Sequence, residues 1–427
     1  MGNLSYADQS YPRAWHTLVA AVWSSTGGGL DRAGLRSLID VQATAAWCLP
    51  AVLSIAMGAL ALQAARRAGL SAAHASTAGF LAATMVLWPP FLSAYQALGF
   101  ENSFVGAIVL AVVARHAMEP AETRIWPFVV VLMGIVVCAN AWQLLLPALG
   151  VALVQQVRRL VRFARGARFA VAVISSLIAA VVALPGILAV VRDVGINHAA
   201  DAGVKAPVPV TLVLGGLLCC GVLAVRCRGD RSITLLWVMT ATPALTAIAV
   251  ALQARIGLFV YYPSKLLWHS AALGLGPLAA VAVMAWSALA GHSMGAVARP
   301  ARVLGTSAAA LAVAFACVNP AGAFIGAWST VRGPEVLAAV TSPEAANAQV
   351  AWLGVPLDDT ISRILLDFYR VDRTSARTPQ PPLSVTEECS LLREAAQPTV
   401  LSSASPPLVQ ARYACVPRIR VVRASAP

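Results

Sequence analysis

Apolar runs separated by short polar connections occupy most of this sequence. They fall at roughly 42–65, 73–90, 102–115, 125–139, 141–157, 168–191, 208–225, 232–253, 265–290 and 303–323. Several are shorter than the roughly 20 residues that a helix needs to cross a membrane. Only 11% of the residues are charged, against about 25% in an ordinary soluble domain. The pattern predicts an all-α polytopic membrane protein with about 10 spans.

One of the apolar stretches, from Ile125 to Gln156, is too long for one helix and long enough for two short ones. Its polar interruption, Ala139-Asn140-Ala141, lies near the middle. We therefore predict a tight pair of short helices here.

The basic residues predict the orientation of the spans. Every second connection is rich in them, with 14 in total, against seven on the other side before residue 324. The richer set is Arg66, Arg67, Arg115, Arg124, Arg158, Arg159, Arg162, Arg165, Arg168, Arg226, Arg228, Arg231, Arg299 and Arg302. Cytoplasmic loops carry the excess of Lys and Arg, so these connections are predicted to be cytoplasmic and both termini to lie outside. This topology explains the net charge of +13 without a nucleic-acid partner.

The composition and the start of the chain add two expectations. Ala is abundant and only two of the 31 basic residues are Lys, which is typical of GC-rich bacterial genomes, so we expect a multi-pass protein of a bacterial plasma membrane. An outer N-terminus with neither a signal peptide nor a leading span predicts a further helix upstream of Met1.

The polar C-terminal region is predicted to be a small extracytoplasmic α/β domain. The predicted segments are 1–41 with an interfacial helix, 42–324 in the membrane and 325–427 outside, and the last holds nine of the 18 acidic residues. Helices are expected at 343–354 and 359–371, with a Pro-rich linker at 374–385. Cys389 and Cys415 lack metal-site spacing, and an exported location favours a disulfide between them.

Glu101 is the first candidate for chemistry. Ionisable groups at the outer membrane face are costly to place and are functional candidates by default. Glu101 lies in an outer loop that also carries aromatic and amide groups, WPPFLSAYQALGFEN. The structural alternative is that Glu101, with Asn102 and Ser103, opens the next helix and favours its positive end.

Two aromatic clusters at the outer face are candidates for substrate binding. The segment YPRAWH holds Arg13, Trp15 and His16, where the aromatic residues would also suit an interfacial helix. The segment FVYYPSKLLWH holds Tyr261, Tyr262, Lys265 and His269. A lysine near a helix end is commonly a snorkelling anchor, but the rarity of lysine in this chain favours a phosphate or carboxylate contact.

The layout resembles the actinobacterial multispan glycosyltransferases of the GT-C architecture, which include arabinofuranosyl- and mannosyltransferases. The resemblance rests on three elements: YPRAWH before an interfacial helix, a short-helix pair around ANAWQLLLP, and YYPSK opening a late span. It implies a polyprenyl-phosphate sugar donor, an envelope glycan acceptor, and activity at the outer face of the membrane. A divalent metal is possible, although no metal-binding motif is present.

The resemblance also places the catalytic carboxylates in a first outer loop, upstream of a segment like YPRAWH. In this sequence Asp8 is the only acidic residue before Tyr11. Asp8 and Glu101 are therefore the catalytic candidates, as the general base that activates an acceptor hydroxyl. Lys265 and Arg13 would stabilise the departing lipid phosphate.

Two other function classes remain open. A transporter or lipid flippase would also have many spans, but the sequence has no clear internal repeat and no acidic residue within a span. A noncatalytic membrane scaffold, whose C-terminal domain binds a partner, is the third class.

Overall fold

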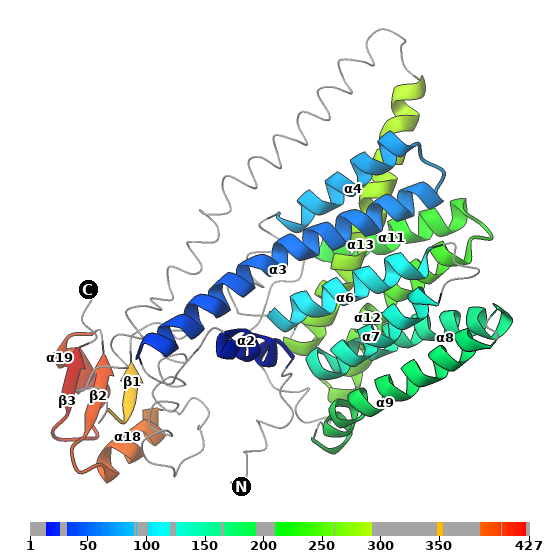
Figure 1. Cartoon of the computed structure of the whole chain (residues 1–427). Coiled ribbons are helices and arrows are strands. Elements are labelled where there is room, and N and C mark those ends of the chain that lie inside the picture. The colour runs from blue at the N-terminus through cyan, green and yellow to red at the C-terminus, as the bar shows by residue number, and fades with distance from the viewer. Residues whose placement is uncertain are drawn as a thin grey trace. The chain divides into compact units, whose positions relative to one another are not determined.

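The computed structural model describes residues 14–25, 32–88, 91, 101–119, 125–163, 166–193, 210–259, 261–292, 348–352, 385–402 and 404–423. The chain divides into two compact units. One is helical and includes the described residues from Ala45 to His292, and the other includes the C-terminal strands. Each unit is described by itself below (Figure 1).

The helices follow the apolar runs of the sequence. They are α2 (Ala14–Ser25), α3 (Arg32–Arg67), α4 (Ala72–Val86), α6 (Glu101–Ala117), α7 (Trp126–Ala141), the 3-10 turn η1 (Gln143–Leu145), α8 (Leu146–Phe163), α9 (Ala167–Asp193), α11 (Val210–Arg226), α12 (Arg231–Ala254) and α13 (Tyr261–His292). Each predicted run from 42–65 to 265–290 coincides with one of them, while the run at 303–323 lies outside the described residues.

The prediction of about 10 spans is not confirmed. Among the described residues, five helices are long and apolar enough to cross a membrane: Cys48–Arg67, Gln143–Arg162, Ala167–Leu184, Arg231–Ala254 and Tyr262–Ser287. The apolar helices Asn102–Ala117, Trp126–Ala141 and Val210–Arg226 are shorter. The other apolar helices are shorter than the roughly 20 residues of a full crossing, and the run at 303–323 lies outside the described residues. Several helices could thus span a membrane, as expected of a multi-pass membrane protein.

The predicted short-helix pair is present, and its break falls at Trp142. Helix α7 ends at Ala141, and Trp142 has an extended backbone with φ −159° and ψ 83°. The amide of Asn140 donates to the carbonyl of Val136 at 2.8 Å. The chain then turns through η1 into α8, so two helix ends meet at Trp142.

Helix α13 is the central element of the helical unit. It packs against α4, α6, α11 and α12, and Figure 1 shows it running behind α3 and α6. It lies close against α11, where a Cβ atom placed on Gly216 would lie 2.6 Å from the Cα atom of Gly274. Small residues at a crossing allow two membrane helices to approach this closely.

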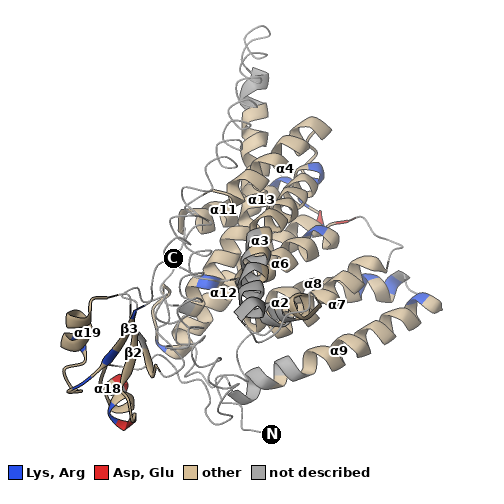
Figure 2. Ribbon diagram, turned by 60° about the vertical axis from the view of Figure 1, so that its left-hand side comes forward, with Lys and Arg blue, Asp and Glu red and all other residues tan. Residues whose placement is uncertain are grey.

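Arginines join the helix ends that the sequence predicts to be cytoplasmic. At the end of α3, Arg67 donates to the carbonyl of Met118 and lies 3.6 Å from the carboxylate of Asp230. In α8, Arg159 donates to the carbonyl of Ala117 at 3.0 Å. These contacts bring the ends of α3, α6 and α8 to the start of α12, and Figure 2 shows basic residues at the end of α8.

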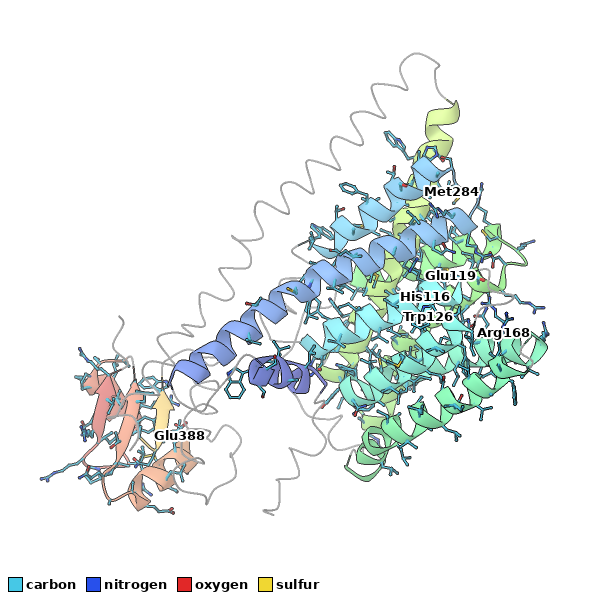
Figure 3. All side chains as sticks on the ribbon, in the orientation of Figure 1. His116, Glu119, Trp126, Arg168, Met284 and Glu388 are labelled. Atoms are coloured by element: carbon cyan, nitrogen blue, oxygen red, sulfur yellow. A yellow bond between two sulfur atoms is a disulfide. The ribbon has the colours of Figure 1, made fainter. Side chains whose placement is uncertain are left out.

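Helix α9 presents large apolar side chains on its surface. Among them, Leu177 is 62% exposed and Val181 is 70% exposed. Figure 3 shows side chains projecting from α9, whose first turn holds Arg168. Such a row is costly in water and favourable in lipid, as expected for a membrane-facing helix.

The C-terminal unit contains a small parallel sheet. Strands β1 (Val350–Trp352), β2 (Thr399–Ser402) and β3 (Arg420–Arg423) lie in the order β1-β2-β3. Helices α18 (Val385–Glu394) and α19 (Pro406–Arg412) belong to the same unit. The predicted helix at 343–354 is wrong for Val350–Trp352, because pairing with β2 and burial of Val350 outweigh the local Ala-rich helix propensity. The predicted helix at 359–371 lies outside the described residues.

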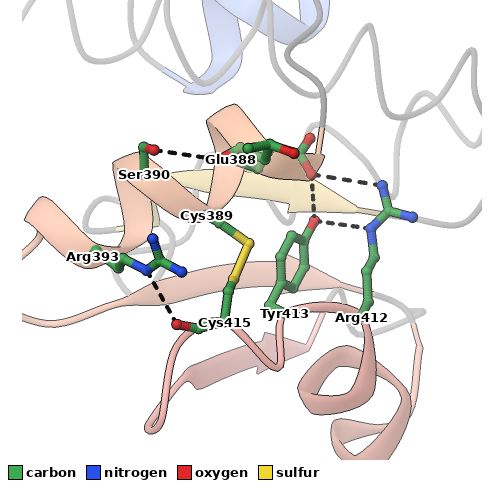
Figure 4. Close-up of a disulfide and its surroundings, with 8 residues drawn as sticks. Glu388, Cys389, Ser390, Arg393, Arg412, Tyr413 and Cys415 are labelled. Atoms are coloured by element: carbon green, nitrogen blue, oxygen red, sulfur yellow. Dashed lines mark hydrogen bonds and ion pairs between the residues drawn. A yellow bond between two sulfur atoms is a disulfide. The ribbon is translucent and has the colours of Figure 1, made fainter.

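The predicted disulfide between Cys389 and Cys415 is present, with the two Cα atoms 6.1 Å apart. It links α18 to the segment after α19 (Figure 4). Beside it, the carboxylate of Glu388 is buried and accepts from the hydroxyl of Tyr413 at 2.9 Å. The guanidinium of Arg412 lies 3.6 Å from the same oxygen. Because its carboxylate has these two partners, Glu388 is tolerated in the core.

Candidate functional site at the start of α13

The first turns of α13 place three candidate residues on one face. Tyr262, Lys265 and His269 follow one another at spacings of three and four residues, which aligns them along a helix. Pro263 is tolerated because it lies in the first turn, where its missing N–H has no helical partner. Lys265 is 6% exposed and His269 is fully buried. Burial of both groups needs polar or aromatic partners.

Trp142, at the break between α7 and α8, covers this face. Its ring lies 5.5 Å from that of His269 and 6.0 Å from that of Tyr262, both in edge-to-face geometry. The Nζ atom of Lys265 lies 5.9 Å from the centroid of the Trp142 ring. The indole is the most favourable aromatic partner for an ammonium group. The break in the short-helix pair therefore positions the aromatic partner of Lys265.

His269 connects α13 to the start of α6. Its Nδ1 atom lies 2.6 Å from the carbonyl oxygen of Lys265, and its Nε2 atom 3.0 Å from that of Ser103. A neutral imidazole has one N–H and donates to one carbonyl at a time, whereas a protonated ring donates to both. A Cβ atom on Gly106 would lie 3.0 Å from Nε2, so glycine at this position permits the close approach.

An aromatic cluster around Trp268 supports the site, and the Trp268 ring meets the His269 ring edge-to-face at 5.5 Å. The ring of Trp268 stacks on Phe91 with centroids 4.8 Å apart and meets the edge of Phe104 at 5.3 Å. The indole N–H of Trp268 donates to the carbonyl of Phe91 at 3.0 Å. These contacts hold the starts of α6 and α13 together.

Helix starts and a lysine favour an anion at this site. Two helices start here, α6 at Glu101 and α13 at Tyr261, while α7 ends beside them at Ala141 and opposes part of their effect. The start of a helix carries partial positive charge and free N–H groups. The ammonium of Lys265 adds a full positive charge. The buried hydroxyl of Ser103 has no hydrogen-bond partner within the described residues, so the site also holds a polar group of the kind that binds ligands.

The structure brings together Tyr262, Lys265 and His269 of the predicted site residues. Tyr261 and Glu101 begin α13 and α6, and Trp15 and His16 lie in α2, but the side chains of all four are outside the described part of the structure. Asp8 and Arg13 are outside it altogether. Within the described residues, no group of three or more His, Cys, Asp and Glu side chains could hold a metal ion.

Sequence reasoning did not identify Trp142 and Ser103 as site residues. Trp142 lies within ANAWQLLLP, the segment in which a helix break was predicted, and an aromatic residue at such a break was the available signal. The sequence indicates Ser103 only as part of a helix start. Its role depends on the packing of α6 against α13, which no local pattern reveals.

Comparisons of the chain with protein-family models, with curated proteins and with solved structures found no match.

Proposed function

We propose that this chain is a membrane glycosyltransferase of the GT-C type. In this proposal it takes a sugar from a polyprenyl-phosphate donor at the outer face of a bacterial plasma membrane and transfers it to an envelope glycan. The observation that carries the proposal is the buried Lys265, which lies where the two helices α6 and α13 begin. A cation and two helix starts suit a phosphate that is attached to a lipid.

In the proposed chemistry, Lys265 binds the phosphate that leaves the sugar. During transfer, the bond between the sugar and the phosphate oxygen breaks, and negative charge grows on that phosphate. The ammonium of Lys265 would stabilise this charge within a site of low polarity, where the interaction is strong. Arg13 is a second proposed phosphate ligand, and Tyr262 offers an aromatic face for the sugar.

The proposed base is an outer carboxylate, either Glu101 or Asp8. It would take the proton of the acceptor hydroxyl as that oxygen attacks the anomeric carbon. Glu101 is the first residue of α6, two residues before Ser103, whose carbonyl contacts His269. This position in the chain supports Glu101 as the stronger candidate of the two.

The test uses the full-length protein in proteoliposomes with radiolabelled polyprenyl-monophosphate arabinofuranose or mannose. Envelope glycan extract serves as the acceptor. Lys265→Met removes the charge with little change in volume, and we expect transfer to fall by about 100-fold or more, as for loss of one stabilising donor. Glu101→Gln should lower it by about 10²–10⁴-fold if Glu101 is the base.

Arg255→Gln is the matched control, because Arg255 is an exposed cation directly after α12. It should leave transfer within about twofold of the wild type, since exposed charges contribute little. Normal transfer by Lys265→Met would refute the phosphate role of Lys265. An intact wild-type protein that transfers neither sugar would count against the proposed function.

A further inference from the structure

A pocket lies between α8 and α12, at the arginine-rich end of the helical unit. Its volume is about 670 Å³, within the range of small-molecule sites. One face of α8, from Val151 to Arg162, and one face of α12, from Arg231 to Val238, line it at helical spacing. The pocket involves none of the residues of the site at the start of α13.

Both walls of the pocket change from apolar to basic toward the same end of the pocket. In α8 the pocket residues change from Val151 and Val154 to Arg158 and Arg162 toward the end of the helix. In α12 Arg231 is the first residue, and the apolar wall follows one to two turns later. Because the end of α8 meets the start of α12, the arginines gather at one end of the pocket and the valines at the other. The pocket is therefore amphipathic along its length.

The arginine end carries an excess of positive charge. Four arginines and no Asp or Glu line the pocket. Arg159 is used in packing, since it donates to the carbonyl of Ala117 and to the hydroxyl of Ser232 at 3.4 Å. The carboxylate at the start of α12, Asp230, is engaged by Arg67 and by the N–H of Ser232.

The other three pocket arginines, Arg158, Arg162 and Arg231, make no salt bridge within the part of the chain that the structure describes. Gln155 also lines the pocket, and its side-chain oxygen has no hydrogen-bond partner among the described residues. In either orientation of the amide, Gln155 offers the pocket a polar contact.

We propose that this pocket binds an anionic glycerophospholipid. The phosphate would lie among Arg158, Arg162 and Arg231, and an acyl chain would follow Val154 and Val151 toward the membrane interior. Basic pockets between membrane helices on the cytoplasmic side suit such headgroups. The arginines lie on the side that the charge distribution predicts to be cytoplasmic, so the lipid comes from that leaflet. This inference does not depend on the proposed transferase activity.

The experiment counts lipids bound to the purified full-length protein by native mass spectrometry. The probes are phosphatidylglycerol, phosphatidylcholine and glycerol 3-phosphate at matched concentrations. We expect phosphatidylglycerol to bind at least about tenfold more tightly than phosphatidylcholine. Glycerol 3-phosphate should not compete, because it lacks the chain that the apolar wall would hold.

Two triple variants separate the pocket from general surface charge. Arg158→Gln/Arg162→Gln/Arg231→Gln should weaken phosphatidylglycerol binding by at least about tenfold. Arg168→Gln/Arg226→Gln/Arg228→Gln removes the same charge from exposed positions outside the pocket and should change binding by less than about twofold. Equal losses in both variants would overturn the proposal.

A third variant retains every arginine. Val154→Trp places a large side chain in the apolar wall at a position that is 52% exposed, so folding does not depend on a small residue there. It should reduce phosphatidylglycerol binding while leaving the arginine end intact. Wild-type affinity in Val154→Trp, or competition by glycerol 3-phosphate at the same concentration as the lipid, would exclude a lipid in this pocket.

Discussion

Replacement of Gly216 by alanine tests the crossing of α11 and α13. The new Cβ atom would lie 2.6 Å from the Cα atom of Gly274 and 3.2 Å from its carbonyl carbon. Carbon atoms pack at about 3.5–4.0 Å, so the two helices have to separate by roughly 1 Å. Overpacking of this kind costs about 1–3 kcal/mol. Because both contacts are with backbone, no side-chain rotation can relieve them.

Gly221→Ala is the control on the same helix, since its Cβ atom would meet nothing within 4 Å. Both substitutions gain the same helix propensity, about 1 kcal/mol relative to glycine. The difference between the two variants therefore isolates the crossing and should be about 1–3 kcal/mol. The assay is unfolding of the full-length protein in mixed micelles by SDS titration. Equal stability of Gly216→Ala and Gly221→Ala would refute the close approach.

Two further predictions concern cysteines. The Cys389→Ser/Cys415→Ser variant should expose the C-terminal unit to proteolysis, because a closed loop with a sequence separation of 26 is worth about 3.5 kcal/mol in the chain-entropy model; unchanged cleavage would contradict this. Burial raises the pKa of Cys227, Asp230 raises it further and Arg226 lowers it. Asp230→Asn should therefore increase the thiolate fraction and speed alkylation by iodoacetamide, and Arg226→Gln should slow it, with the reverse order refuting the assignment.

The helices could largely be predicted from the sequence, because lipid-facing and core-facing residues are both apolar and form uninterrupted runs. The number of spans could not. Helix α4 has 15 residues and α7 has 16, lengths at which apolar composition no longer distinguishes a crossing from a shorter helix. Strand β1 was also missed, since its pairing partner β2 lies about 50 residues away in the sequence.

The candidate site was predicted only where residue type was informative. Lys265 is a candidate because lysine occurs only twice in the chain, and His269 because it lies in the same outer segment, FVYYPSKLLWH. The contacts that define the site involve Trp142 and Ser103, which come from the α7–α8 break and from α6. Contacts between such distant segments depend on the tertiary packing of helices.

The short helices beside the candidate site also affect the surrounding bilayer. Helix α6 has 17 residues and α7 has 16, which at 1.5 Å per residue correspond to about 24–26 Å. The hydrocarbon core of a membrane is about 30 Å thick, so for these helices to cross it the lipids around them have to thin by about 4–6 Å. Hydrophobic mismatch of this size would bring the headgroup region toward the ends of these helices, where Trp142 lies. Under the proposed function, a lipid-borne substrate would then reach the start of α13 by lateral diffusion, without leaving the membrane.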